Sequence, residues 1–350
     1  MPIPTSPPTA LPCTPVVAVV PRRASWQLRI AHAALYATAR KFFLLAVWLD
    51  AHTPIPPRSL LWVARIPEPL LRPLRPIRGT RLRRVQLADC RAEWVWHRNQ
   101  PDPGQVPDSA ILYLHGGGLV ACGLNSHRRL VSRIAHAAGV PVLNVDYRQI
   151  PRVHVTDTVE DCVGAYEYLL AQGFPAERIV LAGDSAGGGL IFSLAAATRE
   201  HGLPMPAGIA AISPWADYDS TARLAHPNDR TEALLPARAY ALPVKWGMAI
   251  DGFLDPAWSP VNHRFDGLPP TLIQVSSTEV VRSDAERLAQ RCAAAGVPVS
   301  LQIWDRAVHV FHAGADIIPD AREAIAHVGA FIRDQVDSND QRNRAIRTTA

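Results

Sequence analysis

Residues 178–188 read Arg-Ile-Val-Leu-Ala-Gly-Asp-Ser-Ala-Gly-Gly and lead into an alanine-rich stretch. The apolar run predicts a buried strand, and the glycines after it predict a tight turn into a helix. Side chains at Gly183 and Gly187 would clash in such a turn, which lifts the hydroxyl of Ser185 out of the sheet. The amides of the helix N-terminus then face any negative charge that develops there. We interpret Ser185 as a nucleophile; the alternative is a tight turn with an incidental serine.

A second glycine-rich segment, His115-Gly116-Gly117-Gly118, stands about 70 residues upstream, directly after the apolar stretch 110–114. Glycines let backbone amides approach a substrate carbonyl oxygen closely, and each such donor lowers the barrier by roughly 3 kcal/mol. Three glycines alone would also suit a flexible loop. Their position before the serine turn favours an oxyanion hole.

A serine hydroxyl needs a general base, and the sequence offers thirteen histidines. With a serine turn of this type, the partners follow along the chain in the order serine, acid, histidine. His309, His312 and His327 come late enough. His309 lies just past the expected strand 299–304, where a loop can return it to the sheet edge, whereas His327 falls in the middle of an expected helix. We predict His309 as the base, with His312 as the main alternative.

The acid should follow the expected strand 271–275, where Glu279 and Asp284 are both within reach. A carboxylate fixes the tautomer of the histidine and stabilises the imidazolium that forms. Asp284 opens an expected helix, so a capping role accounts for it. We predict Glu279, which is closer to the strand end.

After residue 107, apolar strands alternate with helical stretches, which is typical of a mostly parallel sheet. Strands are expected at 110–114, 140–145, 179–182, 208–212, 271–275 and 299–304. Helices are expected at 126–138, 159–172, 186–201, 284–295 and 321–335. The alternation breaks after Trp215 for more than fifty residues, and long interruptions of this kind are often functional. Upstream, 83–86 and 92–97 resemble two antiparallel strands.

The two ends of the chain have a different composition. Residues 1–23 are rich in proline and predict a disordered lead, and residues 338–350 predict a flexible tail. Helical periodicity covers 24–52. The most apolar early run there, 42–49, has eight residues, whereas a membrane span needs about 20, so we expect no bilayer crossing. The pattern of a secretory signal is also missing.

The 350 residues are 48% hydrophobic and carry a net charge of +5. This net charge is modest for the length of the chain, so we expect no nucleic-acid partner. The first hundred residues hold fifteen basic and four acidic side chains, and the rest of the chain is net acidic. This asymmetry suits a weak peripheral contact of 24–52 with anionic lipid, although a solvated surface explains it more simply. Five scattered cysteines predict free thiols, no metal site and a cytoplasmic location.

Together these segments resemble the hormone-sensitive lipase-like family of esterases over about residues 107–335. The matching pieces are His115-Gly116-Gly117-Gly118, Asp146-Tyr147-Arg148, Gly183-Asp184-Ser185-Ala186-Gly187-Gly188, Ser213-Pro214-Trp215, Asp255-Pro256, Ser259-Pro260 and His309-Val310-Phe311. The resemblance implies an α/β-hydrolase fold, with a mostly parallel central sheet, helices on both faces and a helical cap. The cap would comprise 24–82 and an insertion at about 216–265 within a hydrolase domain of 83–337.

The resemblance also implies oxyanion donors from Gly117, Gly118 and Ala186, and the register of the family pattern places Glu279 at the acid. The chain departs from the family at Gln149-Ile150-Pro151-Arg152, where Leu-Ala-Pro-Glu is common. The implied activity is hydrolysis of carboxylic esters with short to medium acyl chains, without a cofactor. The same groups suit an amide, carbamate or lactone. A non-catalytic receptor would require loss of the nucleophile or the base, and both are present.

Overall fold

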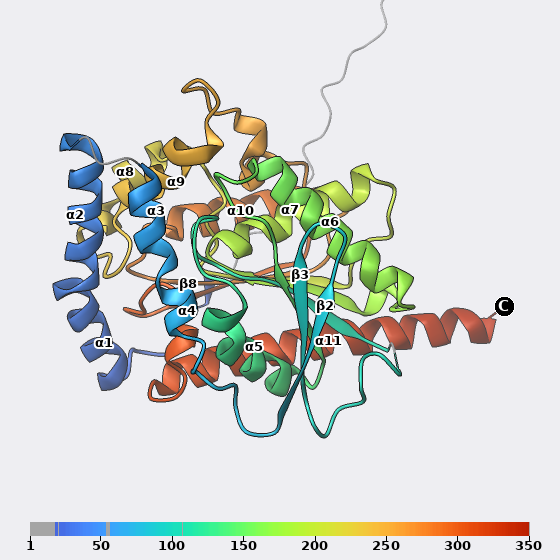
Figure 1. Cartoon of the computed structure of the whole chain (residues 1–350). Coiled ribbons are helices and arrows are strands. Elements are labelled where there is room, and N and C mark those ends of the chain that lie inside the picture. Colours follow the sequence, from blue (N-terminus) through green and yellow to red (C-terminus); the bar gives the residue numbers. More distant parts are fainter. Residues whose placement is uncertain (1–17, 20, 54–56, 107, 350) are drawn as a thin grey trace, which may run out of the picture.

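A nine-stranded sheet runs through the part of the chain that the computed structural model describes, namely residues 18–19, 21–53, 57–106 and 108–349 (Figure 1). Its strands are β1 (Ala18–Val19), β2 (Thr80–Gln86), β3 (Arg91–His97), β4 (Ala110–Leu114), β5 (Val142–Asp146), β6 (Ile179–Asp184), β7 (Gly208–Ile212), β8 (Thr271–Ser276) and β9 (Val299–Trp304). The order across the sheet is β1-β9-β8-β7-β6-β4-β5-β3-β2. Only the pairs β2–β3 and β3–β5 are antiparallel. The expected mostly parallel sheet is confirmed.

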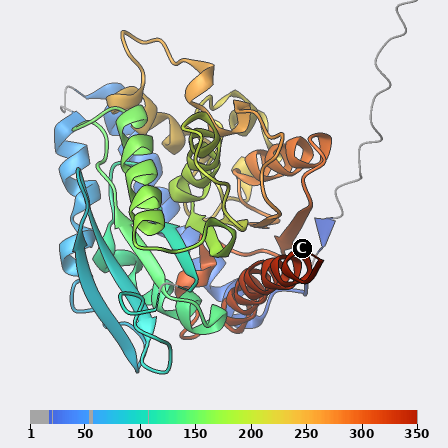
Figure 2. The same cartoon turned by 90° about the vertical axis from the view of Figure 1, so that its right-hand side faces the viewer.

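Helices cover both faces of this sheet (Figures 1 and 2). The longer ones are α1 (Trp26–Ala37), α2 (Ala39–His52), α3 (Pro57–Arg65), α5 (Leu124–Ala138), α6 (Val155–Ala171), α7 (Ala186–Glu200), α10 (Arg282–Ala294) and α11 (Pro319–Thr349). Side chains of α5 and α11 share one buried core with one face of the sheet, and those of α6, α7 and α10 share a second core with the other. Because both faces are covered, the central strands are continuous apolar runs rather than alternating ones.

Short helical turns connect these elements. They are α4 (Pro67–Leu70), η1 (Ala176–Arg178), α8 (Thr221–Ala225), η2 (Pro227–Arg230), η3 (Ala237–Tyr240), α9 (Ala241–Pro243), η4 (Val244–Met248), η5 (Pro256–Trp258), η6 (Pro260–Asn262) and η7 (Phe311–Gly314). Seven of them lie in the expected insertion of 216–265, which has proline in four of these turns and so cannot extend into long helices.

Both ends of the chain differ from expectation where they are described. Within the lead of 1–23, residues 1–17 and 20 lie outside the described residues, but Ala18–Val19 pair in parallel with Leu301–Gln302 at the sheet edge. The tail of 338–350 was expected to be flexible, yet α11 runs on to Thr349. No glycine or proline occurs between residues 330 and 349, so nothing in that stretch stops the helix.

The single helix expected over 24–52 is divided at Thr38 into α1 and α2. The hydroxyl of Thr38 donates to the carbonyl of Ala34 at 2.6 Å, a back-bond that bends helices. Residues 26–52 are together long and apolar enough to cross a membrane by length and composition alone, so the length argument against a bilayer crossing does not apply to them. The expectation relied on the uninterrupted run of 42–49 and overlooked the alanines that extend the apolar character on either side.

Candidate active site

Ser185 occupies the single position between β6 and α7. Its backbone has φ +51° and ψ −119°, a conformation that a residue with a side chain adopts only at a cost. Its amide donates to the carbonyl of Ile212 at 2.8 Å, and its own carbonyl accepts from Trp215 at 2.9 Å. A Cβ at Gly187 would overlap the carbonyl of Leu114, so the next turn has no room for a side chain. The strand–turn–helix predicted from the sequence is therefore a rigid, strained corner.

The structure brings Ser185, His309 and Glu279 together, three residues from segments far apart in the chain. The hydroxyl oxygen of Ser185 lies 2.8 Å from Nε2 of His309. The other ring nitrogen of His309, Nδ1, lies 2.9 Å from Oε2 of Glu279. All three are buried, and only Ser185 and His309 keep a few per cent of exposed surface. This geometry allows a proton to pass from the serine to the imidazole.

The carboxylate of Glu279 is held in place by two further donors. Its Oε1 accepts from the hydroxyl of Ser213 at 2.9 Å and from the amide of Ser276 at 3.0 Å. Oε2 is thereby left for His309. A carboxylate with both oxygens engaged in fixed hydrogen bonds orients the imidazole without moving itself.

Two opposing effects act on the pKa of His309. Burial lowers it, but the hydrogen bond and the negative charge of Glu279 outweigh burial, so the pKa is raised above its ordinary value. Glu232 and Asp184 add smaller contributions in the same direction. A histidine with a raised pKa accepts a proton more readily, which suits a general base.

Glu232 is a buried carboxylate that the sequence analysis did not single out. Its Oε2 accepts from the amide of Val280, the residue after Glu279, at 3.0 Å, and its Oε1 accepts from the amide of Leu234 at 2.9 Å. Burial and the neighbouring Glu279 raise the pKa of Glu232 to about 7. It joins the insertion to the loop that carries the acid. In the sequence, only the apolar neighbours Ala233 and Leu234 could have indicated that Glu232 is buried. They do not identify its hydrogen-bond partner.

The alternatives considered for the base lie elsewhere. His312 is buried with its Nε2 2.7 Å from Oε1 of Gln274, and burial lowers its pKa to about 3. His327 on α11 lies 3.2 Å from Oε1 of Gln302. Both are bonded to glutamine side chains of the sheet, whereas the histidine bonded to the hydroxyl of Ser185 is His309.

The glycine loop after β4 is positioned by the residue that precedes the serine. Oδ1 of Asp184 accepts from the amide of Gly116 at 3.1 Å and from the hydroxyl of Tyr113 at 2.7 Å, while Oδ2 lies 3.2 Å from Nε2 of His127. Burial raises the pKa of Asp184, but the charge of His127 outweighs it, and the pKa is lowered. A charged Asp184 thus fixes the loop to the serine corner.

The expected oxyanion donors lie on the two segments that Asp184 joins. Gly117 and Gly118 have φ of +116° and +63°, a region that favours glycine, and a Cβ at Gly117 would overlap the carbonyl of Ala121. Ala186 is the first residue of α7, where no intrahelical carbonyl can accept its amide. The expected hole thus comprises two glycines with positive φ and one helix N-terminus.

Tyr147 and Gln149 stabilise this loop through hydrogen bonds to backbone carbonyls at its two ends. The hydroxyl of Tyr147 donates to the carbonyl of His115 at 2.5 Å, and the rings of these two residues stack. The amide of Gln149, at the first position where the chain departs from the family, donates to the carbonyl of Cys122 at 2.9 Å. The departure therefore supplies a hydrogen bond to the loop rather than removing one.

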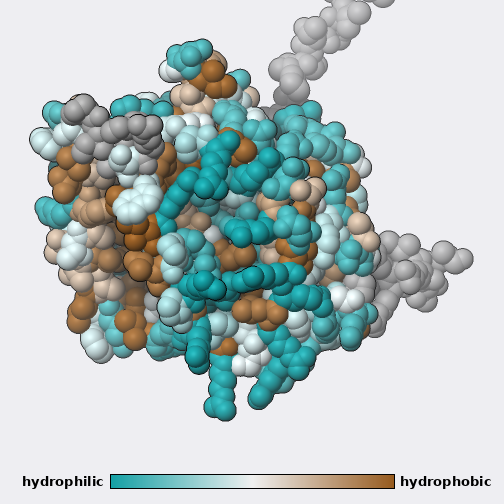
Figure 3. Space-filling view, in the orientation of Figure 1, coloured by the Kyte–Doolittle hydropathy of each residue, from teal (hydrophilic) through white to brown (hydrophobic). Residues whose placement is uncertain are grey.

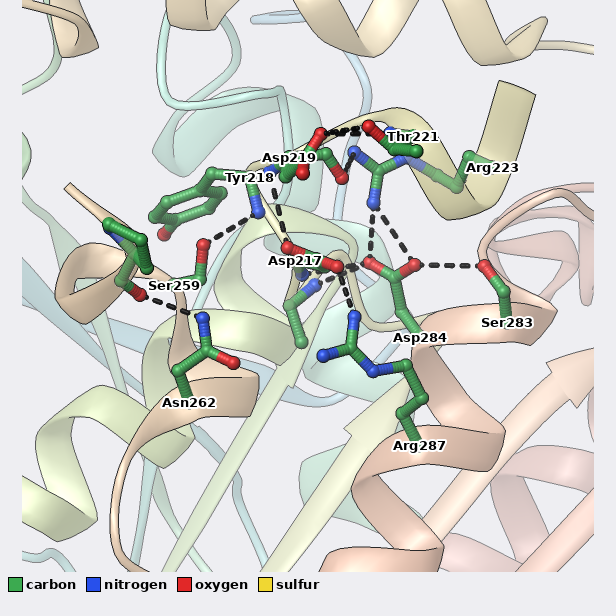
Figure 4. Close-up of polar contacts among 12 residues, drawn as sticks. Asp217, Tyr218, Asp219, Thr221, Arg223, Ser259, Asn262, Ser283, Asp284 and Arg287 are labelled. Carbon is green, nitrogen blue, oxygen red and sulfur yellow. Dashed lines mark hydrogen bonds and ion pairs between the residues drawn. The ribbon is translucent and has the colours of Figure 1, made fainter. Parts of the chain in front are cut away.

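Asp284 does not cap its helix, which corrects the role assigned from the sequence. The helix α10 begins at Arg282, and the Asp284 carboxylate is buried against Arg223, whose guanidinium donates to it at 2.8 and 3.0 Å (Figure 4). It also accepts from the amides of Ala216 and Asp217 at 3.0 and 2.9 Å. Asp284 therefore fixes the start of the insertion to the hydrolase domain. The sequence reading failed because the partner, Arg223, lies 61 positions away.

The C-terminal end of the insertion is also bonded to the residues beside Asp284 (Figure 4). The hydroxyl of Ser259 accepts from the amide of Tyr218 at 2.9 Å, and the amide of Val261 donates to the carbonyl of Ala216 at 3.0 Å. Arg287 on α10 pairs with Asp217. Both ends of the insertion are thus joined beside Asp284, and the Ser259-Pro260 segment has a structural role.

The cysteine side chains do not suit the role of nucleophile. Cys90, Cys122, Cys162 and Cys292 are free, and Cys13 lies outside the described residues. Burial raises the pKa of Cys122, which is near the glycine loop, to about 12. The thiolate is the reactive form, and it is scarce at neutral pH with such a pKa. In the described residues, no group of three or more metal-binding side chains is arranged to hold an ion.

Comparison with known proteins agrees with this fold. A family model described as alpha/beta hydrolase fold matches residues 111–313. The esterase LipU of Mycobacterium tuberculosis is 42% identical over 238 residues, 66% of this chain and 80% of that protein. An acetyl-hydrolase of Streptomyces hygroscopicus is 39% identical over 249 residues, 71% of this chain and 81% of that protein. A solved esterase from the bacterial hormone-sensitive lipase family superposes with a TM-score of 0.74 at 33% identity, over 87% of this chain and 98% of that one.

The sheet, the strained serine corner and these matches define an α/β hydrolase of the carboxylic-ester hydrolase class. Within that class, the chain belongs to the hormone-sensitive lipase-like family of esterases. The resemblance drawn from the sequence is confirmed.

Proposed function

We propose that this chain hydrolyses carboxylic esters of short to medium acyl length through a covalent acyl-enzyme on Ser185. His309 takes the serine proton on Nε2 as the serine oxygen attacks the ester carbonyl carbon. Glu279, bonded to Nδ1, keeps the imidazole in the required tautomer and stabilises the imidazolium. The observation that carries the proposal is the continuous hydrogen-bond chain, 2.8 Å from Ser185 to His309 and 2.9 Å from His309 to Glu279.

The negative charge that forms on the carbonyl oxygen needs donors. In this proposal the amides of Gly117, Gly118 and Ala186 bind it, and each donor contributes roughly 3 kcal/mol to lowering the barrier. When the tetrahedral intermediate collapses, the alcohol leaves with the proton held by His309. Water then attacks the acyl-enzyme by the same route, returning a proton to Ser185 and releasing the acid.

Two observations support a short to medium acyl chain. The ring of Tyr240 lies edge-on to the His309 ring, with 6.3 Å between the ring centroids. The ring of Trp215 packs against that of Tyr240, with 5.6 Å between the ring centroids. In this proposal these buried aromatic rings limit the length of the acyl chain that fits beside the base. One of the relatives is also named an acetyl-hydrolase.

The test is a hydrolysis profile over p-nitrophenyl esters from acetate to palmitate, with Ser185→Ala as the matched inactive variant. We expect kcat/KM to be highest between acetate and octanoate, and Ser185→Ala to lower kcat by about 10⁶ because the three groups act as a unit. Turnover of an amide, carbamate or lactone above that of every ester would reassign the substrate. Ester binding without turnover in the unmodified protein would instead indicate a receptor.

A further inference from the structure

The long helical segment α1–α2 presents its apolar face to the solvent. Trp26 is 68% exposed, and Phe42 and Trp48 are each more than half exposed. Among the residues of α1 and α2, only Leu28 is buried. Figure 3 shows the apolar residues gathered over this side of the molecule, away from the hydrophilic side chains that cover its centre. Exposed apolar surface of this extent marks an interaction site.

The inner face of the same segment is mixed: Leu28 is buried in the core and Ala31 and Leu35 pack against it, and polar side chains beside them bond to the insertion. His32 lies 3.1 Å from the carbonyl of Thr231, and the guanidinium of Arg40 donates to the carbonyl of Asp229 at 2.7 Å. Further along, Asp50 accepts from Lys245 at 2.7 Å and from the indole of Trp246 at 2.9 Å. These bonds hold one side of the segment against the insertion, and the exposed side chains of Trp26, Phe42 and Trp48 lie outside these contacts.

The segment around this face carries mostly positive charge. Residues 21–80 contain ten basic side chains and only two acidic ones, Asp50 and Glu68. Asp50 is engaged by Lys245 and Trp246, and Glu68 accepts from two amides at the start of α5. Arg29 and Lys41 are exposed on α1 and α2. A partner for this face must accept apolar and aromatic side chains together with positive charge.

We infer that the exposed face of α1–α2 docks the enzyme onto the surface of an anionic lipid bilayer. Aromatic and aliphatic side chains beside arginine and lysine are what interfacial helices use. A second copy of the chain fits less well, because a two-fold interface would bring the same arginines and lysines face to face. The inner-face bonds keep the segment along the protein, so it lies in the membrane surface and does not cross it.

The test is co-sedimentation of the full-length protein with vesicles of phosphatidylcholine alone or mixed with phosphatidylglycerol, at low and high salt. We expect binding that is stronger to the anionic vesicles and weaker with added salt. Phe42→Gln/Leu45→Gln/Trp48→Gln should lower partitioning at least tenfold on both. Lys41→Gln should lower it roughly fivefold on anionic vesicles only, since one basic residue near such a surface is worth about 1 kcal/mol.

Leu82→Gln is the matched control, because Leu82 is an exposed leucine on the edge strand β2. It should bind vesicles like the unmodified protein. All variants should hydrolyse soluble p-nitrophenyl butyrate at the unmodified rate, which separates a failure of docking from a failure of catalysis. Full-length protein that stays in the supernatant, or equal binding by the triple variant, would overturn the inference. A dimer on size exclusion that the triple variant dissociates would assign the face to a second copy.

Discussion

Replacing Asp284 with asparagine removes one negative charge and preserves the size of the side chain. Arg223, its partner, is completely buried and donates two hydrogen bonds to it at 2.8 and 3.0 Å. Removing one member of a buried ion pair costs about 3–5 kcal/mol, because the other charge is left without compensation. Asparagine keeps a carbonyl oxygen for the amides of Ala216 and Asp217. We therefore expect a loss at the lower end, about 3 kcal/mol of the free energy of unfolding.

The assay combines urea unfolding, followed by tryptophan fluorescence, with kcat measured on the folded protein. Asp284→Asn should lower the urea midpoint and leave kcat nearly unchanged, because its contacts are with the insertion and not with Ser185 or His309. The double variant Asp284→Asn/Arg223→Met should recover more than half of the lost stability, since the unpaired charge is gone while the two amides keep an acceptor.

Two results would refute this reasoning. Unchanged stability in Asp284→Asn would mean that the ion pair does not hold the insertion. A fall of kcat by about a hundredfold, or about 2.7 kcal/mol of barrier, with unchanged stability would assign Asp284 to catalysis.

Three further predictions concern the groups around His309. Glu279→Gln should lower kcat by about 10⁴, by analogy with the same change in serine proteases, measured beside Asp284→Asn as the matched acid-to-amide control; equal activities would contradict the choice of Glu279. His309 acts as a base only when neutral, so kcat/KM should fall as pH drops through its raised pKa, with the acid limb above the ordinary value of about 6.5. Glu232→Gln removes a charge that raises this pKa, so the acid limb of its pH profile should move to lower pH. An unmoved limb would leave Glu232 with a structural role alone.

Much of the fold could be predicted from the sequence because its signals are local. The apolar run before Ser185, the glycines after it and the alternation of strands and helices each lie within one short window. The order of serine, acid and histidine then reduced the thirteen histidines to a few, and the structure puts His309, not His312, next to Ser185.

The rest depends on contacts between distant residues in segments without periodicity. The partner of Asp284 lies 61 positions away in the insertion, and Glu232 reaches Val280 across 48 positions. For residues 24–52, the periodicity showed which side chains share a face but not which face is inward. That depended on a hydrogen bond that Arg40 donates to the insertion and one that Asp50 accepts from it, which no local pattern encodes.

Covalent labelling tests the central claim, that Ser185 is the nucleophile activated by His309, most directly. The protein is treated with a p-nitrophenyl phosphonate ester, which transfers its phosphonyl group to an activated serine, and the label is located by intact mass and peptide mapping. The account predicts one phosphonyl group per chain, on the peptide containing Ser185, in proportion to the activity lost, and no labelling in His309→Ala. Complete inactivation with the label on any other residue, or full activity with Ser185 labelled, would contradict it.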